Sequence, residues 1–472
     1  MKRWGTALIV AVLSCIPVLL RHATSPALLA DSDTAFLLKV IREKRAPISW
    51  FTSDWPLGNH FYRPISTLPF ELDNRLYGDS AAGYGWTNCL LCVACILLVA
   101  WLWREVTDSV ALTCGGTALF ALWHWNGLGR ISPWIALLAQ AFVAVSFFWR
   151  LLRRYVPSLA VGRPKVNLWR DMEWGRWLPA CGALYFLSGA LDGIVGLQFR
   201  MIDWIPGRTA SVMTVFCLIS MAAYARYERT SARFDPVRPT ATDEPATKSS
   251  VQDAGPSRAN WAWPILATLS GALALASYEQ AVMLPTALLG IAVSFRIRRF
   301  RVRWGWQVGF WSLLVAYWLV RHAYVPSDVS GYQAQQFRSG PGVYFSLLAY
   351  LFPAASSIYL FFKSLDLGWT LLITDRLYGA VWFAYSNLAS LQAALRHWQL
   401  ALTGFALSFF AYLPMAWLNQ FDHYHYWPMA LRSLYVSCLA WGVWELCVIA
   451  VSPPARQAPE RLAPAPGSLP HP

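Results

Sequence analysis

Two acidic residues, Asp31 and Asp33, open the longest polar stretch near the N-terminus, directly after a hydrophobic run. We therefore expect both carboxylates at a membrane surface. A carboxylate whose pKa is raised by partial burial can act as a base toward a hydroxyl group. The same spacing also suits the start of a helix, because Asp before Thr-Ala-Phe-Leu-Leu is a common N-cap. Spacing alone leaves catalysis and helix capping open.

The same stretch, residues 30–88, supplies a cation among aromatic rings in the sequence Gly58-Asn59-His60-Phe61-Tyr62-Arg63-Pro64. Acids, an arginine and many aromatic rings held at a membrane face suit a charged, lipid-linked substrate. We therefore predict that Tyr62 and Arg63 bind substrate. The alternative is that Arg63 only extends its charge to the membrane surface.

Further ionisable groups lie beside apolar runs, where they need a special reason to be. A charge at the centre of a bilayer costs roughly 2.5–3.5 kcal/mol, so such groups usually line a cavity or face water. Glu279 is the sharpest case, because apolar runs flank it and Pro285 follows shortly after. It is either a cavity-lining acid or an exposed residue at a tight outward turn. The other candidates for substrate binding are His124, Arg130, Arg321, His423 and Tyr426.

The composition indicates a polytopic membrane protein. Of the 472 residues, 56% are hydrophobic and 14% are charged, against roughly 45–50% and about 25% in soluble proteins. The formal net charge of +14 comes from basic residues clustered between apolar runs. That pattern indicates membrane topology and anionic lipid headgroups, not nucleic acid.

The apolar runs predict about twelve transmembrane helices. The first, from Trp4 to Leu20, is expected to be an uncleaved span with the N-terminus in the cytoplasm. A weaker stretch near 369–390 contains Asp375 and Arg376 and is expected to be re-entrant or interfacial. The remaining spans are expected near 84–103, 108–125, 133–152, 178–197, 208–225, 261–278, 281–296, 306–323, 344–362, 398–417 and 430–450.

The charge pattern orients these spans and divides the chain. Basic residues concentrate in the loops that would be cytoplasmic, so the candidate residues above fall on the opposite face. We predict an N-terminal membrane half at 1–226, whose first extracytoplasmic loop (21–83) carries short amphipathic helices and the catalytic residues. A disordered linker at 227–258, a second membrane half at 259–451 and a disordered tail at 452–472 follow.

Three of the nine cysteines, Cys89, Cys92 and Cys95, have the spacing of a metal motif. They stand in an apolar run, however, and three-residue steps on a helix give a stripe of small side chains. Packing is therefore favoured over a metal or redox role, and no disulfide framework is implied. We predict no metal ligands among them.

Four segments resemble the C-type (GT-C) membrane glycosyltransferases, closest to bacterial relatives of the transmembrane O-mannosyltransferases. The first combines the acidic pair with Tyr62-Arg63-Pro64-Ile65-Ser66-Thr67-Leu68 and Leu76-Tyr77-Gly78. The second is His124 to Arg130. The third is Ala276-Ser277-Tyr278-Glu279-Gln280-Ala281. The fourth is Leu413-Pro414 with Tyr424-His425-Tyr426-Trp427-Pro428.

The chain departs from the family pattern at three places. Asp31-Ser32-Asp33 stands where adjacent Asp residues are usual, so either acid could be the base. Tyr278 replaces a Lys, and Asp422-His423 replaces a Glu-Arg pair. No tetratricopeptide repeats follow the membrane part, so they give no indication of the acceptor.

The resemblance implies transfer of a sugar from a polyprenyl-phosphate donor to a hydroxyl acceptor, with inversion, at the outer face of a bacterial inner membrane. Asp33 or Asp31 would be the base. Arg63, Arg321 and His423 would hold the phosphate. Glu279 would orient the acceptor, hold a metal or tune the Asp. The implied partners are the donor, the acceptor and membrane lipids. A divalent cation is compatible with the carboxylates, although nothing in the sequence requires one.

Rival interpretations are a secondary transporter or a flippase for lipid-linked glycans, a non-catalytic scaffold, and an O-antigen polymerase or ligase. A transporter should have its ionisable groups near the bilayer midplane in both halves, whereas those of this chain gather on one face.

Overall fold

The structure is a computed structural model, and it describes most of the chain. The described residues are 2–23, 31–44, 46–125, 201–234, 261–298, 302–344, 395–419 and 421–451, with isolated positions elsewhere. Every regular element in these ranges is a helix, and a single isolated bridge joins Phe337 to Leu418. The predicted all-α class is therefore confirmed for this part of the chain.

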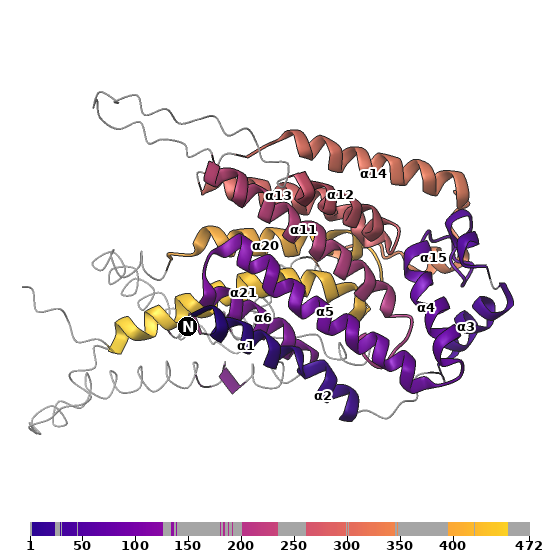
Figure 1. Cartoon of the computed structure of the whole chain (residues 1–472), viewed down its shortest axis with the longest axis horizontal. Coiled ribbons are helices and arrows are strands. Elements are labelled where there is room, and N and C mark those ends of the chain that lie inside the picture. Colours follow the sequence, from indigo (N-terminus) through magenta and orange to yellow (C-terminus); the bar gives the residue numbers. More distant parts are fainter. Residues whose placement is uncertain are drawn as a thin grey trace, which may run out of the picture.

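Long helices lie side by side and form the body of the molecule (Figure 1). They are α5 (Ala81–Thr107), α6 (Val110–His124), α11 (Arg208–Phe234), α12 (Ala262–Leu275), α13 (Leu284–Ile297), α14 (Gly305–Tyr324), α20 (Trp398–Tyr412) and α21 (Tyr426–Val451). Gly404 of α20 shows how closely they pack, because an added Cβ would lie 2.7 Å from the backbone nitrogen of Tyr435 on α21. Small residues at such contacts are typical of membrane helices.

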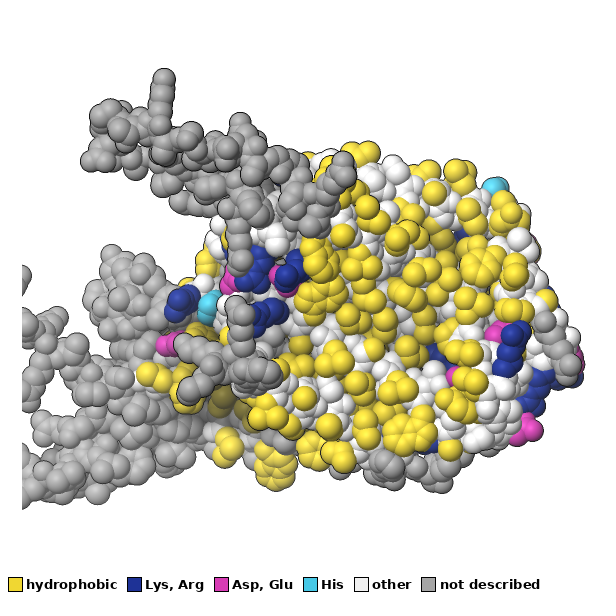
Figure 2. All heavy atoms as spheres, viewed as in Figure 1, with side chains coloured by type: hydrophobic (Ala, Val, Ile, Leu, Met, Phe, Trp, Pro, Cys, Tyr) yellow, Lys and Arg dark blue, Asp and Glu magenta, His cyan; other side chains and the backbone are white. Residues whose placement is uncertain are grey.

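Four stretches of the described chain are long and apolar enough to cross a membrane, namely Ala81–Thr107, Arg208–Ser231, Glu279–Ile297 and Trp398–Met415. Shorter apolar helices cover Gly5–Arg21, Val110–His124 and Ala262–Leu275. In the view of Figure 2, apolar side chains cover the middle of the molecule and charged side chains gather toward its two ends. This distribution is what a membrane-spanning helical protein requires.

Several predicted boundaries differ from the observed ones. The first apolar run forms two helices, α1 (Lys2–Ser14) and α2 (Ile16–Ala23), which are separated at Cys15. Helix α11 continues to Phe234, past the predicted start of the linker at 227, because Arg226 and Arg229 pair with Glu105 of α5. The remaining linker, the tail beyond 451 and the predicted spans near 133–152, 178–197, 344–362 and 369–390 lie outside the continuously described ranges.

Short helices gather at one end of the long ones (Figure 1). They are α3 (Ser32–Lys44), the 3₁₀ helix η1 (Pro47–Thr52), α4 (Pro64–Tyr77) and α15 (Gly331–Gln336). We call residues 31–80 together with α15 the cap. The cap has its own apolar core, which includes Leu37, Ile41, Trp50, Trp55 and Phe70. The predicted first loop thus contains short helices.

A buried ion pair fastens the cap to the long helices. The Arg208 side chain has no exposed surface, and its Nη1 lies 2.7 Å from Oδ2 of Asp73 on α4. Arg208 also donates to Oδ1 of Asn88 at 2.7 Å and to the carbonyl of Tyr84 at 3.0 Å. Thr87 donates to the other oxygen of Asp73. A buried charge pair needs this degree of hydrogen bonding to persist, so the role of Asp73 is structural.

Candidate functional site

Three of the four segments singled out in the sequence meet where the cap joins the long helices. Pro64 opens α4, and the residues after it bond to the chain following α12: Ile65 N donates to Ala276 O at 3.1 Å, and Ser66 Oγ donates to Ser277 O at 2.6 Å. The Gln280 amide then donates to the carbonyls of Ala411 and Tyr424, at 2.8 and 2.9 Å. These bonds fix the local positions of residues far apart in sequence.

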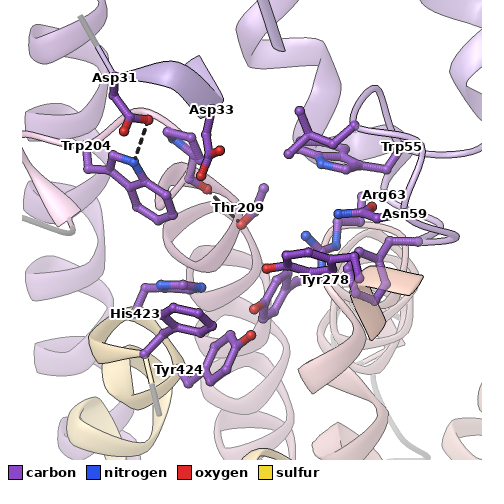
Figure 3. Close-up of a pocket in the computed structure, with 15 residues that line it drawn as sticks. Asp31, Asp33, Trp55, Asn59, Arg63, Trp204, Thr209, Tyr278, His423 and Tyr424 are labelled. Atoms are coloured by element: carbon purple, nitrogen blue, oxygen red, sulfur yellow. Dashed lines mark hydrogen bonds between the residues drawn. The ribbon is translucent and has the colours of Figure 1, made fainter. Parts of the chain in front are cut away.

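A cavity of about 330 Å³ lies at this junction (Figure 3). Four residues predicted to act on substrate line it together: Asp31, Asp33, Arg63 and His423. The other lining residues are Trp55, Leu57, Asn59, Phe61, Trp204, Pro206, Thr209, Tyr278, Tyr332, Phe421 and Tyr424.

The two acids at the start of α3 have different surroundings. Asp31 Oδ2 accepts from the backbone N–H of Thr34 at 3.2 Å and from Trp204 Nε1 at 3.0 Å. Asp31 therefore caps α3 and ties it to the segment before α11. Asp33 lies within the first turn of α3 and also lines the cavity (Figure 3). Both acids therefore line the cavity, and Oδ2 of Asp31 also holds the start of α3 in place.

Only two of the three guanidinium nitrogens of Arg63 have a hydrogen-bond partner among the described residues. Its Nη2 and Nε lie 2.6 and 2.8 Å from Oε2 of Glu279, and its guanidinium lies 4.1 Å from the ring centre of Phe61 and 4.3 Å from that of Tyr278. Burial lowers the pKa of Arg63, but the Glu279 carboxylate outweighs burial, so the net pKa is raised and the charge is kept. Nη1 makes no hydrogen bond to any described residue, which leaves a charged donor beside the cavity.

Glu279 is not on the cavity wall, contrary to one interpretation of its sequence context. It opens the 3₁₀ helix η4 (Glu279–Met283) with 23% of its side chain exposed, and its carboxylate is directed to Arg63. The contact that the structure shows is with Arg63, which it orients, and the expected roles toward the acceptor, a metal or the Asp stay predictions. Glu279 is also not simply a water-exposed residue at a turn, because it forms this ion pair.

Two tyrosines line the cavity near Arg63. Burial raises the pKa of Tyr278 well above its ordinary value and that of Tyr424 to about 12. Both hydroxyls therefore stay protonated at neutral pH and can donate hydrogen bonds. The His423 ring lies beside both, with its centre 4.5 Å from that of Tyr424 and 6.4 Å from that of Tyr278.

The remaining predicted binding residues lie away from the cavity. His124 and Tyr426 bond to each other between α6 and α21, with Nε2 and the hydroxyl 2.9 Å apart, and both are fully buried. The Tyr62 hydroxyl donates to Phe51 O at 3.1 Å. Arg321 donates to His60 O at 3.2 Å and so supports the cavity-lining loop from outside. Arg130 lies outside the described residues.

Sequence reasoning missed the neutral part of the wall, above all Trp55, Asn59, Trp204 and Thr209. Neutral and aromatic residues near a membrane are too common to stand out in a sequence. The one available signal is for Trp204, which follows Asp203 in a short polar interruption before α11.

Two observations within the described ranges bear on metal and cysteine chemistry. No three His, Cys, Asp or Glu side chains there are grouped to hold a metal ion. Cys89, Cys92 and Cys95 are buried on α5, where the thiol of Cys95 lies 3.8 Å from the carbonyl oxygen of Ser211. The stripe therefore packs α5 against α11.

Within the described residues, the fold and site define an all-α arrangement with membrane-length helices and a capped cavity that has carboxylates at one end and a guanidinium at the other. No protein-family model, curated protein or solved structure matches this chain.

Proposed function

We propose that the protein is a membrane glycosyltransferase that moves a sugar from a polyprenyl-phosphate donor to a hydroxyl acceptor. The observation that carries the proposal is the meeting of Asp33, Arg63 and His423 in one cavity. The cavity offers what such a transfer needs, namely a base for the acceptor and a cation for the leaving phosphate.

The proposed step is a single displacement. Asp33 takes the proton of the acceptor hydroxyl as its oxygen forms a bond to the anomeric carbon. The bond from that carbon to the phosphate oxygen breaks, and polyprenyl phosphate leaves with the electron pair. Arg63 Nη1 stabilises the charge that develops on the phosphate, and the anomeric configuration is inverted. The proton on Asp33 is then lost to water.

Neighbouring groups would assist without changing this balance. The Tyr278 and Tyr424 hydroxyls can donate to phosphate oxygens, because both remain protonated. Glu279 holds the guanidinium of Arg63 in place. A divalent cation at the carboxylate end stays compatible with this scheme.

The finer architecture belongs to the same proposal. We infer a GT-C-like arrangement of about twelve spans in a bacterial inner membrane, with the cap and its cavity on the periplasmic or exterior face. Its support is the clustering of basic residues in the opposite loops and the position of the cap at one end of the apolar helices (Figures 1 and 2).

The test is radiolabelled transfer by the purified full-length protein in proteoliposomes, using a panel of polyprenyl-phosphate sugars. Wild type should form product, the Asp33→Asn variant should not, and Asn419→Ala, outside the cavity, should match wild type. Movement of the labelled lipid across the bilayer with no transfer would overturn the proposal in favour of a flippase. Full activity of both Asp31→Asn and Asp33→Asn would also end it.

A further inference from the structure

The cavity-lining loop has an unusual backbone around Asn59. Its two neighbours, Gly58 and His60, have φ angles of +64° and +60°. Glycine adopts this region freely, but a histidine does so at a cost of about 1 kcal/mol or more. The Asp54 carboxylate holds the turn by accepting from the backbone N–H groups of Trp55, His60 and Phe61 at 2.7–2.9 Å.

The loop is also held from its outer side. The His60 carbonyl accepts from Arg321 Nη2 and from Gln333 Nε2, each at 3.2 Å. Ser330 Oγ donates to the Asn59 carbonyl at 3.2 Å. Hydrogen bonds therefore fix the backbone on both sides of Asn59, and they leave its side chain out.

The Asn59 side chain is buried but makes no hydrogen bond within the described chain. The residue is 8% exposed, and Oδ1 is among the buried polar atoms that have no partner. No described residue bonds to Nδ2 either. Asn59 lines the cavity on the side of Arg63 (Figure 3). Buried polar groups in native proteins are nearly always paired, so an unpaired amide on a cavity wall indicates a missing ligand group.

The chemistry of the amide selects the kind of ligand group. Oδ1 needs a donor, which a phosphate diester does not have, whereas Nδ2 needs an acceptor. Two neighbouring hydroxyls satisfy both, because one can donate to Oδ1 while the other accepts from Nδ2. We propose that Asn59 binds a vicinal diol of the sugar and makes the cavity selective for it, while Arg63 beside it takes the phosphate. This inference deepens the proposed function and rests on it.

The proposal predicts a loss that depends on specific hydroxyls. Asn59→Ala should lower kcat/KM about ten-fold to a hundred-fold with the full donor. With the deoxy donor that lacks the partner hydroxyl, the same substitution should change kcat/KM by less than about three-fold, because wild type has already lost the contact. Asn419→Ala should leave all donors unaffected. Equal losses on every deoxy donor, or no loss, would overturn the assignment.

A second measurement separates this proposal from the proposed function. Binding of methyl glycosides to the full-length protein in nanodiscs, followed by saturation-transfer NMR, needs neither phosphate nor reaction. Binding that weakens with Asn59→Ala and with the matching deoxy glycoside supports the sugar contact even if no transfer is found. Transfer by wild type together with glycoside binding unchanged in Asn59→Ala would reject the contact and leave the transferase intact. Thermal unfolding of Asn59→Ala within a few degrees of wild type shows that the loop is folded.

Discussion

Two arginine–carboxylate pairs join the cap to the long helices. They differ in how many of the guanidinium nitrogens have hydrogen-bond partners. Arg208 has no exposed surface and bonds to Asp73, Asn88 and the Tyr84 carbonyl. Arg63 is 11% exposed, and both of its bonds to Glu279 end on one carboxylate oxygen. An arginine whose nitrogens all have partners, such as Arg208, supports the structure; we call this a saturated pair. An arginine with an unbonded N–H group, such as Arg63, can also bind a ligand; we call this an open pair.

The comparison extends to the two acids of the cap. Asp31 also lines the cavity, but its Oδ2 caps α3 and accepts from Trp204. Asp33 lies on the cavity wall with Arg63. We therefore propose that Asp33 and Arg63 act on substrate, whereas Asp31, Asp73 and Arg208 hold the site in place.

The largest effect is expected from breaking the saturated pair. Arg208→Met leaves the Asp73 carboxylate buried without a counter-charge, which costs about 3–5 kcal/mol. We expect little folded protein in the membrane and a strong loss of stability for what remains. The measurement is the free energy of unfolding in mixed micelles. An Arg208→Met variant as stable as wild type would show that the Arg208–Asp73 pair is not needed to hold the structure.

Removing the proposed base should abolish catalysis but keep the fold. Asp33→Asn retains the shape of the side chain and removes its basicity, so we expect transfer to fall about 10²-fold to 10⁴-fold. Asp31→Ala should instead keep most activity and lose about 1 kcal/mol of stability, because α3 loses its N-cap. Transfer rate and unfolding free energy, measured on both variants, check this. If the Asp31 variant lost transfer and the Asp33 variant lost only stability, the two residues would have the opposite roles.

Changing the shape of the Arg63 side chain should reduce the transfer rate more than it reduces the stability of the protein. Arg63→Lys keeps the charge but loses the planar fork and the free Nη1. Transfer should fall about ten-fold to a hundred-fold, while stability changes by no more than about 1–2 kcal/mol. Steady-state kinetics and thermal unfolding measure the two losses. A collapse of stability equal to that of Arg208→Met would make Arg63 a structural residue.

A smaller effect, with the opposite sign, tests the role of Glu279. Glu279→Gln can still hydrogen-bond Arg63 but removes a negative charge beside the phosphate position. We expect polyprenyl phosphate to bind about five-fold more tightly, equivalent to about 1 kcal/mol. Inhibition by this product measures its affinity. Weaker binding would mean that the charge of Glu279 is needed for more than orienting Arg63.

The sequence predicted those features that carry a physical cost. Apolar runs predicted the long helices, because only helices satisfy the backbone in a bilayer. Asp33, Arg63 and His423 stood out because ionisable groups rarely adjoin apolar runs. The partnership of Arg63 with Glu279, 216 positions away, depends on tertiary packing and has no local signal. The hydrogen bond between His124 and Tyr426 likewise has no local signal in the sequence.

The neutral wall residues were beyond sequence reasoning. Asn59 is one asparagine in a polar loop, and only the structure shows that its amide is buried without a described partner. Trp204 is one of 27 tryptophans, and its bond to Asp31 requires knowledge of how α3 meets α11. Such contacts depend on how several helices pack together, which one sequence does not specify.

The central claim is that Asp33 and Arg63 face one ligand cavity on one side of the membrane. The most direct test introduces Asp33→Cys and Arg63→Cys separately into a background without the nine native cysteines, and labels intact cells with a membrane-impermeant thiol reagent. The account predicts that both positions react from outside and that a methyl glycoside bound in the cavity slows both reactions. Labelling from opposite sides of the membrane, or protection of only one position, would contradict it.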